Sequence, residues 1–234
     1  MTSNKVGSQR KKLLVLTSTF PRWQGDKEPP FVFELCRRLS KDFDVWVLAP
    51  HAQGARTRET LNELTVVRFH YFFDWGETLT YRGGIMANLR SNWLNYLLVP
   101  LFFIFQLAAL LRLLSQENFD VVHAHWLIPQ GLIAVAARGG FRQPPALLCT
   151  AHGSDLYGLR GVLFSALKRL VMRRSDAISM VSQAMKEETV ALGAEPAKIS
   201  VISMGVDTAN TFTPAKHPAR HNNQLLFVGR LAAQ

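Results

Sequence analysis

Cysteine is scarce in this chain: there are two among 234 residues, Cys36 and Cys149, and both stand in apolar segments far apart in the sequence. Neither takes part in a cysteine pattern typical of a disulfide framework or a zinc site. We therefore expect two reduced, buried thiols, as in a cytoplasmic protein.

Acidic residues are also few, with 17 Asp and Glu against 27 Lys and Arg, for a formal net charge of +10. This balance suits anionic partners such as phosphate-bearing ligands, membrane surfaces or nucleic acid. We expect no nucleic-acid partner, because the basic residues are not interleaved with an aromatic platform or a recognisable reader motif.

Long apolar runs are missing from the N-terminus, where the run after the basic residues extends only from Leu13 to Leu16. That length is too short for the core of a signal peptide. Internal repeats and low-complexity tracts are absent as well. Hydrophobic residues make up 48% of the chain, which is enough for the core of one large or two modest domains.

Short apolar runs alternate with longer helical patterns along the chain, which predicts right-handed βαβ crossovers. We expect an α/β fold, a Rossmann-like parallel sheet with helices on both faces. The expected strands are Leu13 to Ser18, Asp44 to Ala49, Thr65 to His70, Asp120 to His125, Leu147 to Ala151, Ala177 to Val181, Ile199 to Met204 and Leu225 to Gly229. The expected helices are Pro30 to Lys41, Asn88 to Gln116, Gln130 to Arg138, Val162 to Arg173 and Gln183 to Leu192.

The composition changes after residue 208. Residues 209–224 hold prolines, histidines and asparagines with almost no large apolar side chain, which is typical of a linker. We expect a basic tail over 1–11, a Rossmann-like domain over 12–208, a linker over 209–224 and the first strand of a truncated second domain over 225–234. The alternative is that the last strand joins the edge of the first sheet, since a lone strand needs neighbours.

The segment from Ala146 to Gly158 is an apolar strand that ends in a His-Gly-Ser-Asp turn. Ligands of open α/β sheets bind just beyond the carboxyl ends of the strands, so His152 and Asp155 are candidate site residues. Gly153 lets a ligand approach the backbone closely. The alternatives are a structural histidine that caps the strand end and an aspartate that caps the following turn.

His123, His125 and Trp126 follow one another at the end of another expected strand. The two histidines share a face, but no carboxylate or cysteine at suitable spacing joins them. We expect no metal site here.

Two segments could meet a membrane. Trp93 to Leu114 is nearly long enough to span a bilayer, but a span would separate strands of one sheet. We expect a largely buried helix on the sheet, with peripheral membrane contact as the alternative. Arg160 to Arg174 carries five basic and no acidic residues among apolar ones, a pattern typical of helices on anionic lipid surfaces, with a solvated sheet-covering helix as the equal alternative.

Several short motifs occur in a fixed order from about Lys12 to Leu231. They are Thr19-Phe20-Pro21, Asp120-Val121-Val122-His123-Ala124-His125-Trp126, Thr150-Ala151-His152-Gly153-Ser154-Asp155, Val181-Ser182, Gly205-Val206-Asp207 and Val228-Gly229-Arg230-Leu231. Together they resemble the N-terminal half of a retaining glycosyltransferase of family 4. Members of this family are two-domain GT-B enzymes that transfer a sugar from a nucleotide-sugar donor.

The resemblance implies roles for individual residues. His152 would be the catalytic residue that contacts and orients the donor sugar, and Trp126 and Asp155 would belong to the acceptor side. Gly25 and Arg230 would bind the donor phosphates, although the family commonly has paired glycines where this chain has Gly25 followed by an aspartate. The family's phosphate-binding lysine and two glutamates would lie beyond Gln234, so we expect the isolated chain to be inactive.

The function implied is retaining sugar transfer to a glycan or lipid-linked acceptor, in polysaccharide or cell-envelope glycan synthesis. The expected partners are a nucleotide-sugar donor, that acceptor, a missing C-terminal domain and an anionic membrane surface, with no metal or other cofactor. The expected location is the cytoplasm, peripheral to the inner face of the cytoplasmic membrane. Alternatives are a non-catalytic docking module paired with a separate C-terminal half, and a sugar-nucleotide epimerase of the same architecture.

Overall fold

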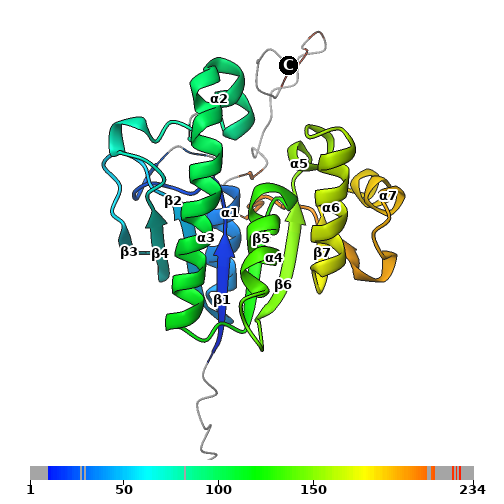
Figure 1. Ribbon diagram of the computed structural model, residues 1–234, viewed down its shortest axis with the longest axis horizontal. Helices are drawn as coiled ribbons and strands as arrows, with labels where there is room; N and C mark the ends of the chain where they lie inside the picture. Colours follow the sequence, from blue (N-terminus) through cyan, green and yellow to red (C-terminus); the bar gives the residue numbers. More distant parts are fainter. Residues whose placement is uncertain are drawn as a thin grey trace, which may run out of the picture. The chain divides into compact units, whose positions relative to one another are not determined.

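One eight-stranded sheet organises the protein in the computed structural model, which describes residues 10–26, 28, 30–81, 83–209, 212, 213, 223, 225 and 227 (Figure 1). The strands are β1 (Lys11–Leu16), β2 (Phe43–Pro50), β3 (Arg58–Leu61), β4 (Leu64–Phe69), β5 (Val121–His125), β6 (Ala146–Ala151), β7 (Ala177–Met180) and β8 (Ile199–Val201). Seven of them correspond to expected strands. The eighth expected strand, Leu225 to Gly229, lies largely outside the described residues.

The strand order is β3-β4-β2-β1-β5-β6-β7-β8. Every neighbouring pair is parallel except β3 and β4, which are antiparallel. The chain starts in the middle of the sheet at β1, builds outward through β2 and β4, and then returns to β5 on the other side of β1. This doubly wound order confirms the predicted Rossmann-like α/β fold.

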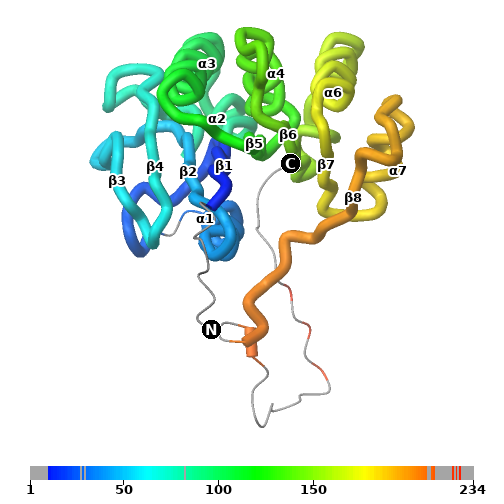
Figure 2. Tube along the Cα trace, turned by 90° about the horizontal axis from the view of Figure 1, so that it is seen from below, coloured from blue at the N-terminus to red at the C-terminus, as the bar shows by residue number. Residues whose placement is uncertain are grey.

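Helices cover both faces of the sheet (Figure 2). On one face lie α3, α4 and α6, while α1 lies on the other and α7 packs against β7 and β8. The α-helices of the described chain are α1 (Phe31–Leu39), α2 (Ile85–Ser91), α3 (Leu98–Gln116), α4 (Leu132–Arg138), α5 (Ser154–Tyr157), α6 (Val162–Arg174) and α7 (Gln183–Ala191).

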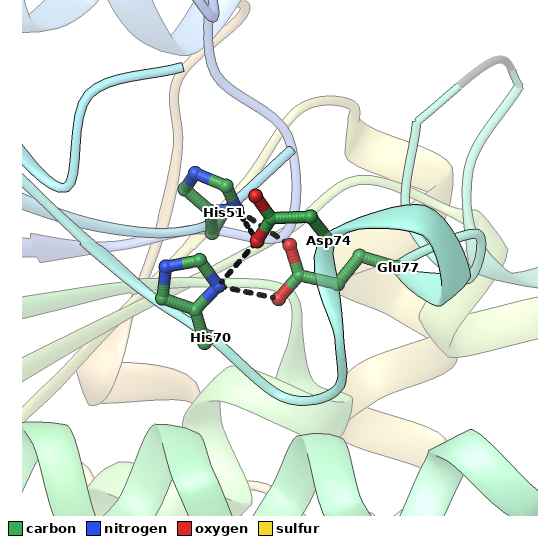
Figure 3. Close-up of side chains that lie close together, drawn as sticks. All are labelled: His51, His70, Asp74 and Glu77. Atoms are coloured by element: carbon green, nitrogen blue, oxygen red, sulfur yellow. Dashed lines mark hydrogen bonds and ion pairs between the residues drawn. The ribbon is translucent and has the colours of Figure 1, made fainter. Parts of the chain in front are cut away.

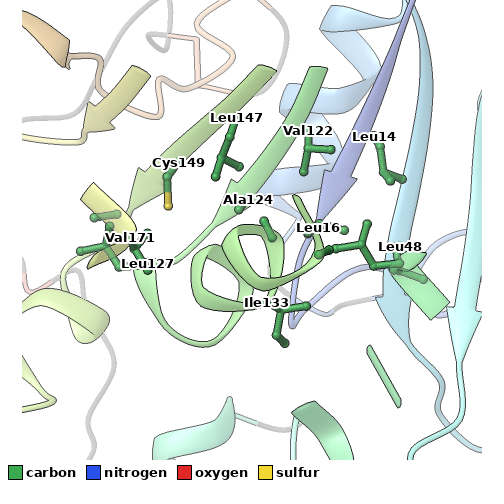
Figure 4. Packing of buried hydrophobic residues seen from close by; sticks show 14 of the residues in the cluster. Leu14, Leu16, Leu48, Val122, Ala124, Leu127, Ile133, Leu147, Cys149 and Val171 are labelled. Atoms are coloured by element: carbon green, nitrogen blue, oxygen red, sulfur yellow. The ribbon is translucent and has the colours of Figure 1, made fainter. Parts of the chain in front are cut away.

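Strand β1 shows how the apolar runs of the sequence become two cores. Leu14 and Leu16 face the α3, α4 and α6 layer, whereas Leu13 and Val15 face α1. All four are almost fully buried. A strand that is buried on both faces must be apolar at every position, which is why this segment is continuous rather than alternating. Figure 4 shows Leu14 and Leu16 packed with Val122, Ala124 and Ile133 in the larger core.

The expected helix from Asn88 to Gln116 is wrong in one respect: it is broken into three pieces. Asn92 has an extended backbone (φ −147°), and its side chain accepts a hydrogen bond from Leu94 N at 3.0 Å. This capping bond ends α2 and starts the short turn η2 (Trp93–Leu97), after which α3 begins. Asparagine competes with helical backbone bonding in this way, and the hydrophobic run concealed the signal.

Strand β3 was not expected. It forms a hairpin with β4 through Asn62 and Glu63, which both have positive φ (47° and 67°). Two successive residues of this kind make the turn whose twist suits a tight hairpin. The strand itself is polar and lies at the sheet edge, so it lacks the apolar run that identified the other strands.

Helix α3 packs on the sheet as expected, in contact with α4, β2 and β4. The expectation that it would be largely buried is wrong. Trp93–Gln116 is the one segment of the described chain that is long and apolar enough to cross a membrane, with a mean hydropathy of 2.3 over an 18-residue window, and 28% of that window is buried. One face, which carries Phe102, Leu110 and Leu113, meets the sheet, while Ile104 and Phe105 on the other face are exposed.

The chain divides into two compact units, residues 1–204 and 205–234. The first holds the whole sheet. In the second, the described residues include a turn in which Phe212 N donates to Asp207 O at 2.8 Å. Most of the expected linker and second-domain strand lies outside the described residues, so the domain boundaries beyond 204 stay predictions.

The close packing of α4 gives a test of the fold. A Cβ on Gly131 would lie 2.8 Å from a methyl group of Val171 and 2.9 Å from Cys149 Sγ, so Gly131→Ala forces the core apart. We expect it to lower the free energy of unfolding by about 1–3 kcal/mol, measured by urea denaturation. Gly139→Ala is the matched control at the other end of α4, where φ is −62° and the nearest atom to a new Cβ is 3.4 Å away. Equal stability of the two variants would contradict the packing described.

Candidate functional site

The candidate site lies where the strand order reverses. β1 and β5 are neighbours from which the chain winds in opposite directions, and a crevice opens at the carboxyl ends of such strands. His125 is the last residue of β5 and pairs in register with Thr150 of the neighbouring β6. His152 follows the end of β6 directly. The fold thus brings both histidines to this edge.

His125 and His152 form a hydrogen-bonded pair. His125 Nδ1 lies 2.9 Å from His152 Nε2, and the two rings are stacked with their centroids 5.1 Å apart. His125 is fully buried, and within the described part of the chain its Nε2 has no hydrogen-bond partner. A buried polar atom without a partner is costly and uncommon in folded proteins.

A third histidine lies behind the pair. The rings of His123 and His125 are 4.2 Å apart, as expected for residues that share a face of β5. His123 Nε2 lies 2.7 Å from the hydroxyl of Thr150, which in turn bonds the hydroxyl of Ser179 on β7. The three histidines and two hydroxyls therefore cross the carboxyl halves of β5, β6 and β7.

All three histidines are held neutral. Burial lowers the pKa of His123 to about 3 and that of His152 to about 4. Burial, together with the two neighbouring histidines, lowers the pKa of His125 well below its ordinary value. At neutral pH each ring is a combined hydrogen-bond donor and acceptor rather than a cation.

Two aromatic rings wall the His152 side chain. The Trp126 ring centroid is 4.8 Å from that of His152, and the Phe31 centroid, at the first residue of α1, is 5.1 Å away. Trp126 has φ +76°, a strained conformation for a bulky residue that is found mainly at functional sites. The structure thus brings Trp126 and His152 together, while the acceptor-side role of Trp126 stays a prediction.

Asp155 links two loops of the candidate site through hydrogen bonds of its side chain. Its carboxylate accepts hydrogen bonds from Leu127 N at 2.7 Å and from His152 N at 3.1 Å. Burial raises the pKa of Asp155, and the hydrogen bonds from the two backbone N–H groups oppose that rise. Gly153, at φ +100°, provides the sharp turn that returns the carboxylate to the His152 backbone. Asp155 therefore couples the loop after β5 to the loop after β6.

Gln130 ties the site to β1. In the amide orientation that satisfies both neighbours, it donates to His125 O at 3.0 Å and accepts from Ser18 N at 3.3 Å. This fully buried side chain bridges the ends of β5 and β1, the two strands that flank the reversal.

Gly25 lies in the exposed loop between β1 and α1, with φ +80°. Arg22 closes that loop by a two-bond ion pair with Asp26, at 2.8 Å for each bond, which lowers the pKa of Asp26 to about 2. The loop leads into α1, whose first residue contacts His152. A phosphate-binding role for Gly25 stays a prediction, and Arg230 lies outside the described residues.

Helix α6, which lies in the basic segment Arg160 to Arg174, exposes fewer positive charges than its sequence indicates. Lys168 of α6 is 3% exposed, and its ammonium donates to the carbonyl oxygens of Leu156 and Leu159. Burial lowers the pKa of Lys168. The side chain fixes the end of α5 and the loop after it and is unavailable to a lipid surface, so one of the five basic residues of this segment is buried, while its contact with a membrane stays a prediction. Arg160, Arg173 and Arg174 of the same segment are exposed.

Two surface hollows, of about 470 and 310 Å³, share Arg173 and Lys198 in their linings. Both residues precede strands, so the hollows lie at the amino edge of the sheet. Ligands of such sheets bind at the opposite edge, so we assign these hollows no role in the candidate site.

Sequence reasoning missed a second group of titratable side chains at the carboxyl edge. His51 follows β2 and His70 follows β4, and both face Asp74 and Glu77 in and just after the turn η1 (Asp74–Gly76) (Figure 3). Their positions in the sequence could have identified these histidines as candidate site residues, because each comes directly after an apolar strand, as His152 does.

Comparison with known proteins supplies the remaining evidence. The model of "Glycosyltransferase Family 4" matches residues 30–210. A glycogen synthase of Mycobacterium tuberculosis is 36% identical over 121 residues, which are 48% of this chain and 28% of that protein. This chain thus spans about a quarter of the length of that relative.

Solved structures share the fold at low identity. Anabaena Alr3699/HepE in complex with UDP-glucose is 13% identical with a TM-score of 0.52, over 84% of this chain and 44% of that one. The Escherichia coli trehalose-6-phosphate protein bound with UDP-2-fluoro glucose is 12% identical with a TM-score of 0.53, over 84% and 49%. A lipopolysaccharide outer core galactosyltransferase, WaaB, is 14% identical with a TM-score of 0.51, over 82% and 45%.

The depressed histidine pKa values predict that the protein loses stability in mild acid. The unfolded chain takes up protons near the ordinary histidine pKa of 6.5, whereas folded His123 and His152 resist protonation down to about 3 and 4. Stability is therefore full above about pH 6.5 and falls as the pH drops toward 4, by up to about 1.4 kcal/mol per pH unit for each histidine. Urea denaturation between pH 7 and pH 5 measures this slope. His123→Gln should make the slope shallower by one histidine's share, and an unchanged slope would show that His123 is not held neutral.

Proposed function

Because the chain belongs to Glycosyltransferase Family 4, we propose that it is the acceptor-side half of a retaining transferase. The enzyme would move a sugar from a nucleotide-sugar donor to a glycan or lipid-linked acceptor, in polysaccharide or cell-envelope glycan synthesis. The neutral His125–His152 pair at the strand reversal is the observation that carries this proposal.

The pair fits a sugar hydroxyl better than an anion. Neutral imidazoles donate and accept hydrogen bonds, as hydroxyl groups do, whereas a phosphate requires donors or positive charge. His152 remains partly exposed between two aromatic rings, while His125 behind it is fully buried. In this arrangement His152 contacts the sugar, and the hydrogen bond to His125 fixes the orientation of its ring.

The chemistry of sugar transfer indicates which groups must bind the donor phosphates. Departure of a nucleoside diphosphate leaves negative charge on the phosphates and positive character at the anomeric carbon. The three histidines are neutral and supply no positive charge, so the compensating donors come from elsewhere. They are the loop that holds Gly25, and a second domain that the family resemblance assigns to residues from 225 onward, with Arg230 as its first phosphate contact. In this proposal the described part of the chain orients the sugar, and the phosphates are bound mainly by other residues.

The length comparison supports the same division. The chain spans 28% of the glycogen synthase that it matches and less than half of the solved structures. We propose that activity requires this chain together with a nucleotide-sugar-binding half, in one polypeptide or two.

A substitution at His152 tests the proposal. In the assembled two-domain enzyme, His152→Ala should lower kcat by about 100-fold and change KM little, because it removes a contact that orients the sugar for reaction. Initial-rate kinetics with the nucleotide-sugar donor measure both constants. His70→Ala is the control, an exposed histidine on the other half of the sheet edge. Full turnover by His152→Ala would remove His152 from the mechanism, and robust transfer by the 234-residue chain alone would disprove the two-part enzyme.

A membrane surface is the second element of the proposal, and the exposed apolar residues of η1, η2 and α3 support it. We call them the aromatic patch: Phe73, Trp75, Trp93, Tyr96, Leu97, Ile104 and Phe105, which are 46% to 74% exposed. Thr78 Oγ1 donates to Asn95 Oδ1 at 2.8 Å, which links the segment after η1 to η2. Large exposed apolar side chains that gather on one part of a protein mark interaction surfaces, and tryptophan and tyrosine favour the lipid interface. The net charge of +10 adds attraction to anionic lipids.

Vesicle binding tests the membrane proposal. Co-sedimentation of the chain should rise with the anionic lipid content of the vesicles, and Trp75→Ser with Trp93→Ser should reduce the bound fraction several-fold, since interfacial tryptophans are removed. Val190→Ser on α7 is the control, because that residue is also partly exposed but lies outside the patch. Binding that ignores both lipid charge and the two tryptophans would exclude the membrane role.

A further inference from the structure

Four side chains at the carboxyl edge of β2 and β4 converge on one point (Figure 3). They are His51, His70, Asp74 and Glu77, and their potential ligand atoms all lie within 4.8 Å of one another. The two histidines follow neighbouring parallel strands, so the sheet itself sets their separation. The carboxylates come from η1 and the residue after it.

The hydrogen bonds of His51 identify which ring nitrogen faces the cluster. Its Nε2 lies 3.0 Å from the carbonyl oxygen of Ala55, and because a carbonyl only accepts, Nε2 carries the proton. In a neutral ring Nδ1 then carries no proton and presents a lone pair. The distance from Nδ1 to Glu77 Oε2 is 2.6 Å. Two acceptors at that distance share a proton, or they separate to take a metal ion as a common partner.

The other two side chains favour a metal ion over a proton. A proton between His51 and Glu77 needs neither His70 nor Asp74, yet His70 Nδ1 lies 3.3 Å from Asp74 Oδ1 and 3.3 Å from Glu77 Oε1. His51 Nδ1 is 3.8 Å from Asp74 Oδ1. Ligands at about 2.1 Å around a tetrahedral ion are separated by about 3.4 Å, close to these three spacings. The 2.6 Å pair of His51 Nδ1 and Glu77 Oε2 is too close for two ligands of one tetrahedral ion, so it has to widen when the ion binds.

We propose that His51, His70, Asp74 and Glu77 form a zinc-binding site. Two neutral imidazoles and two carboxylates carry a charge of −2, which balances Zn²⁺, and nitrogen and oxygen ligands in a set of four suit this ion. The surroundings already orient the ligands: Ala55 O fixes the His51 tautomer, and Tyr71 N donates to Glu77 Oε1 at 3.0 Å. Such outer hydrogen bonds are characteristic of metal sites.

The site has an entry path and a structural consequence. The His51 and Glu77 side chains are buried at 4% and 0% exposure, whereas those of His70 and Asp74 are 44% and 61% exposed, so an ion enters from solvent on their side. A bound ion would fasten η1, with Phe73 and Trp75 of the aromatic patch, to the ends of β2 and β4. This role is independent of sugar transfer.

Zinc titration of the metal-free 234-residue chain tests the site. We expect saturable 1:1 binding by calorimetry, a rise in Tm with zinc concentration, and a tetrahedral absorption spectrum when Co²⁺ is used instead. His70→Gln and Asp74→Asn should each weaken zinc binding by at least about 10-fold, and both alter exposed side chains whose loss leaves the core intact. The double variant His217→Gln/His221→Gln is the control for histidines elsewhere, and it should bind zinc as the unmodified chain does.

Imidazole ¹⁵N NMR of the unmodified chain gives a readout that does not depend on any variant. Zinc should shift Nδ1 of His51 and His70 and leave the nitrogens of His152 unchanged. Absence of saturable binding at micromolar zinc, or binding that survives His70→Gln and Asp74→Asn undiminished, would overturn the proposal. A His51 ring protonated on both nitrogens and indifferent to zinc would assign the cluster to an imidazolium–carboxylate pair instead.

Discussion

The reversal of strand order between β1 and β5 is the constraint on which the rest of the structure depends. Because β1 is central, the sheet grows on one side of it through β2 and on the other side through β5, and the chain passes from β1 to α1 on one face and from β5 to α4 on the other. Gln130 bridges the backbones that border this reversal, Asp155 couples the next two loops, and His125 and His152 occupy the space that results. Burial at this place keeps the histidines neutral.

The same edge carries two histidine groups with different chemistry. Around His152 the neighbours are aromatic rings and another neutral imidazole, which suits a polar but uncharged ligand. Around His51 and His70 the neighbours are carboxylates, which suits a cation. Parallel strands repeat one geometry along an edge, and the residues that follow each strand decide what binds there.

The fold and part of the site were predictable from sequence. Buried parallel strands are continuous apolar runs, so seven strands and the doubly wound class could be recognised, and His152 was identifiable because it ends such a run before a glycine turn. Other features depend on contacts between distant residues. The polar strand β3 is defined by its pairing with β4, the break at Asn92 by a local capping bond, and the burial of Lys168 by two carbonyl oxygens. In the His51 cluster each histidine directly follows a strand, which is a local signal, but the convergence of the four side chains depends on contacts between residues far apart in the sequence.

We propose that a neutral His125–His152 pair receives the sugar of a nucleotide-sugar donor. The most direct measurement is imidazole ¹⁵N NMR of the assembled two-domain enzyme during titration with the donor. We expect both rings to be neutral at pH 6, His125 and His152 to show one shared, saturable change in chemical shift, and His51 and His70 not to respond. Rings that are protonated at pH 6, or that remain unchanged when the donor is saturating, would contradict it.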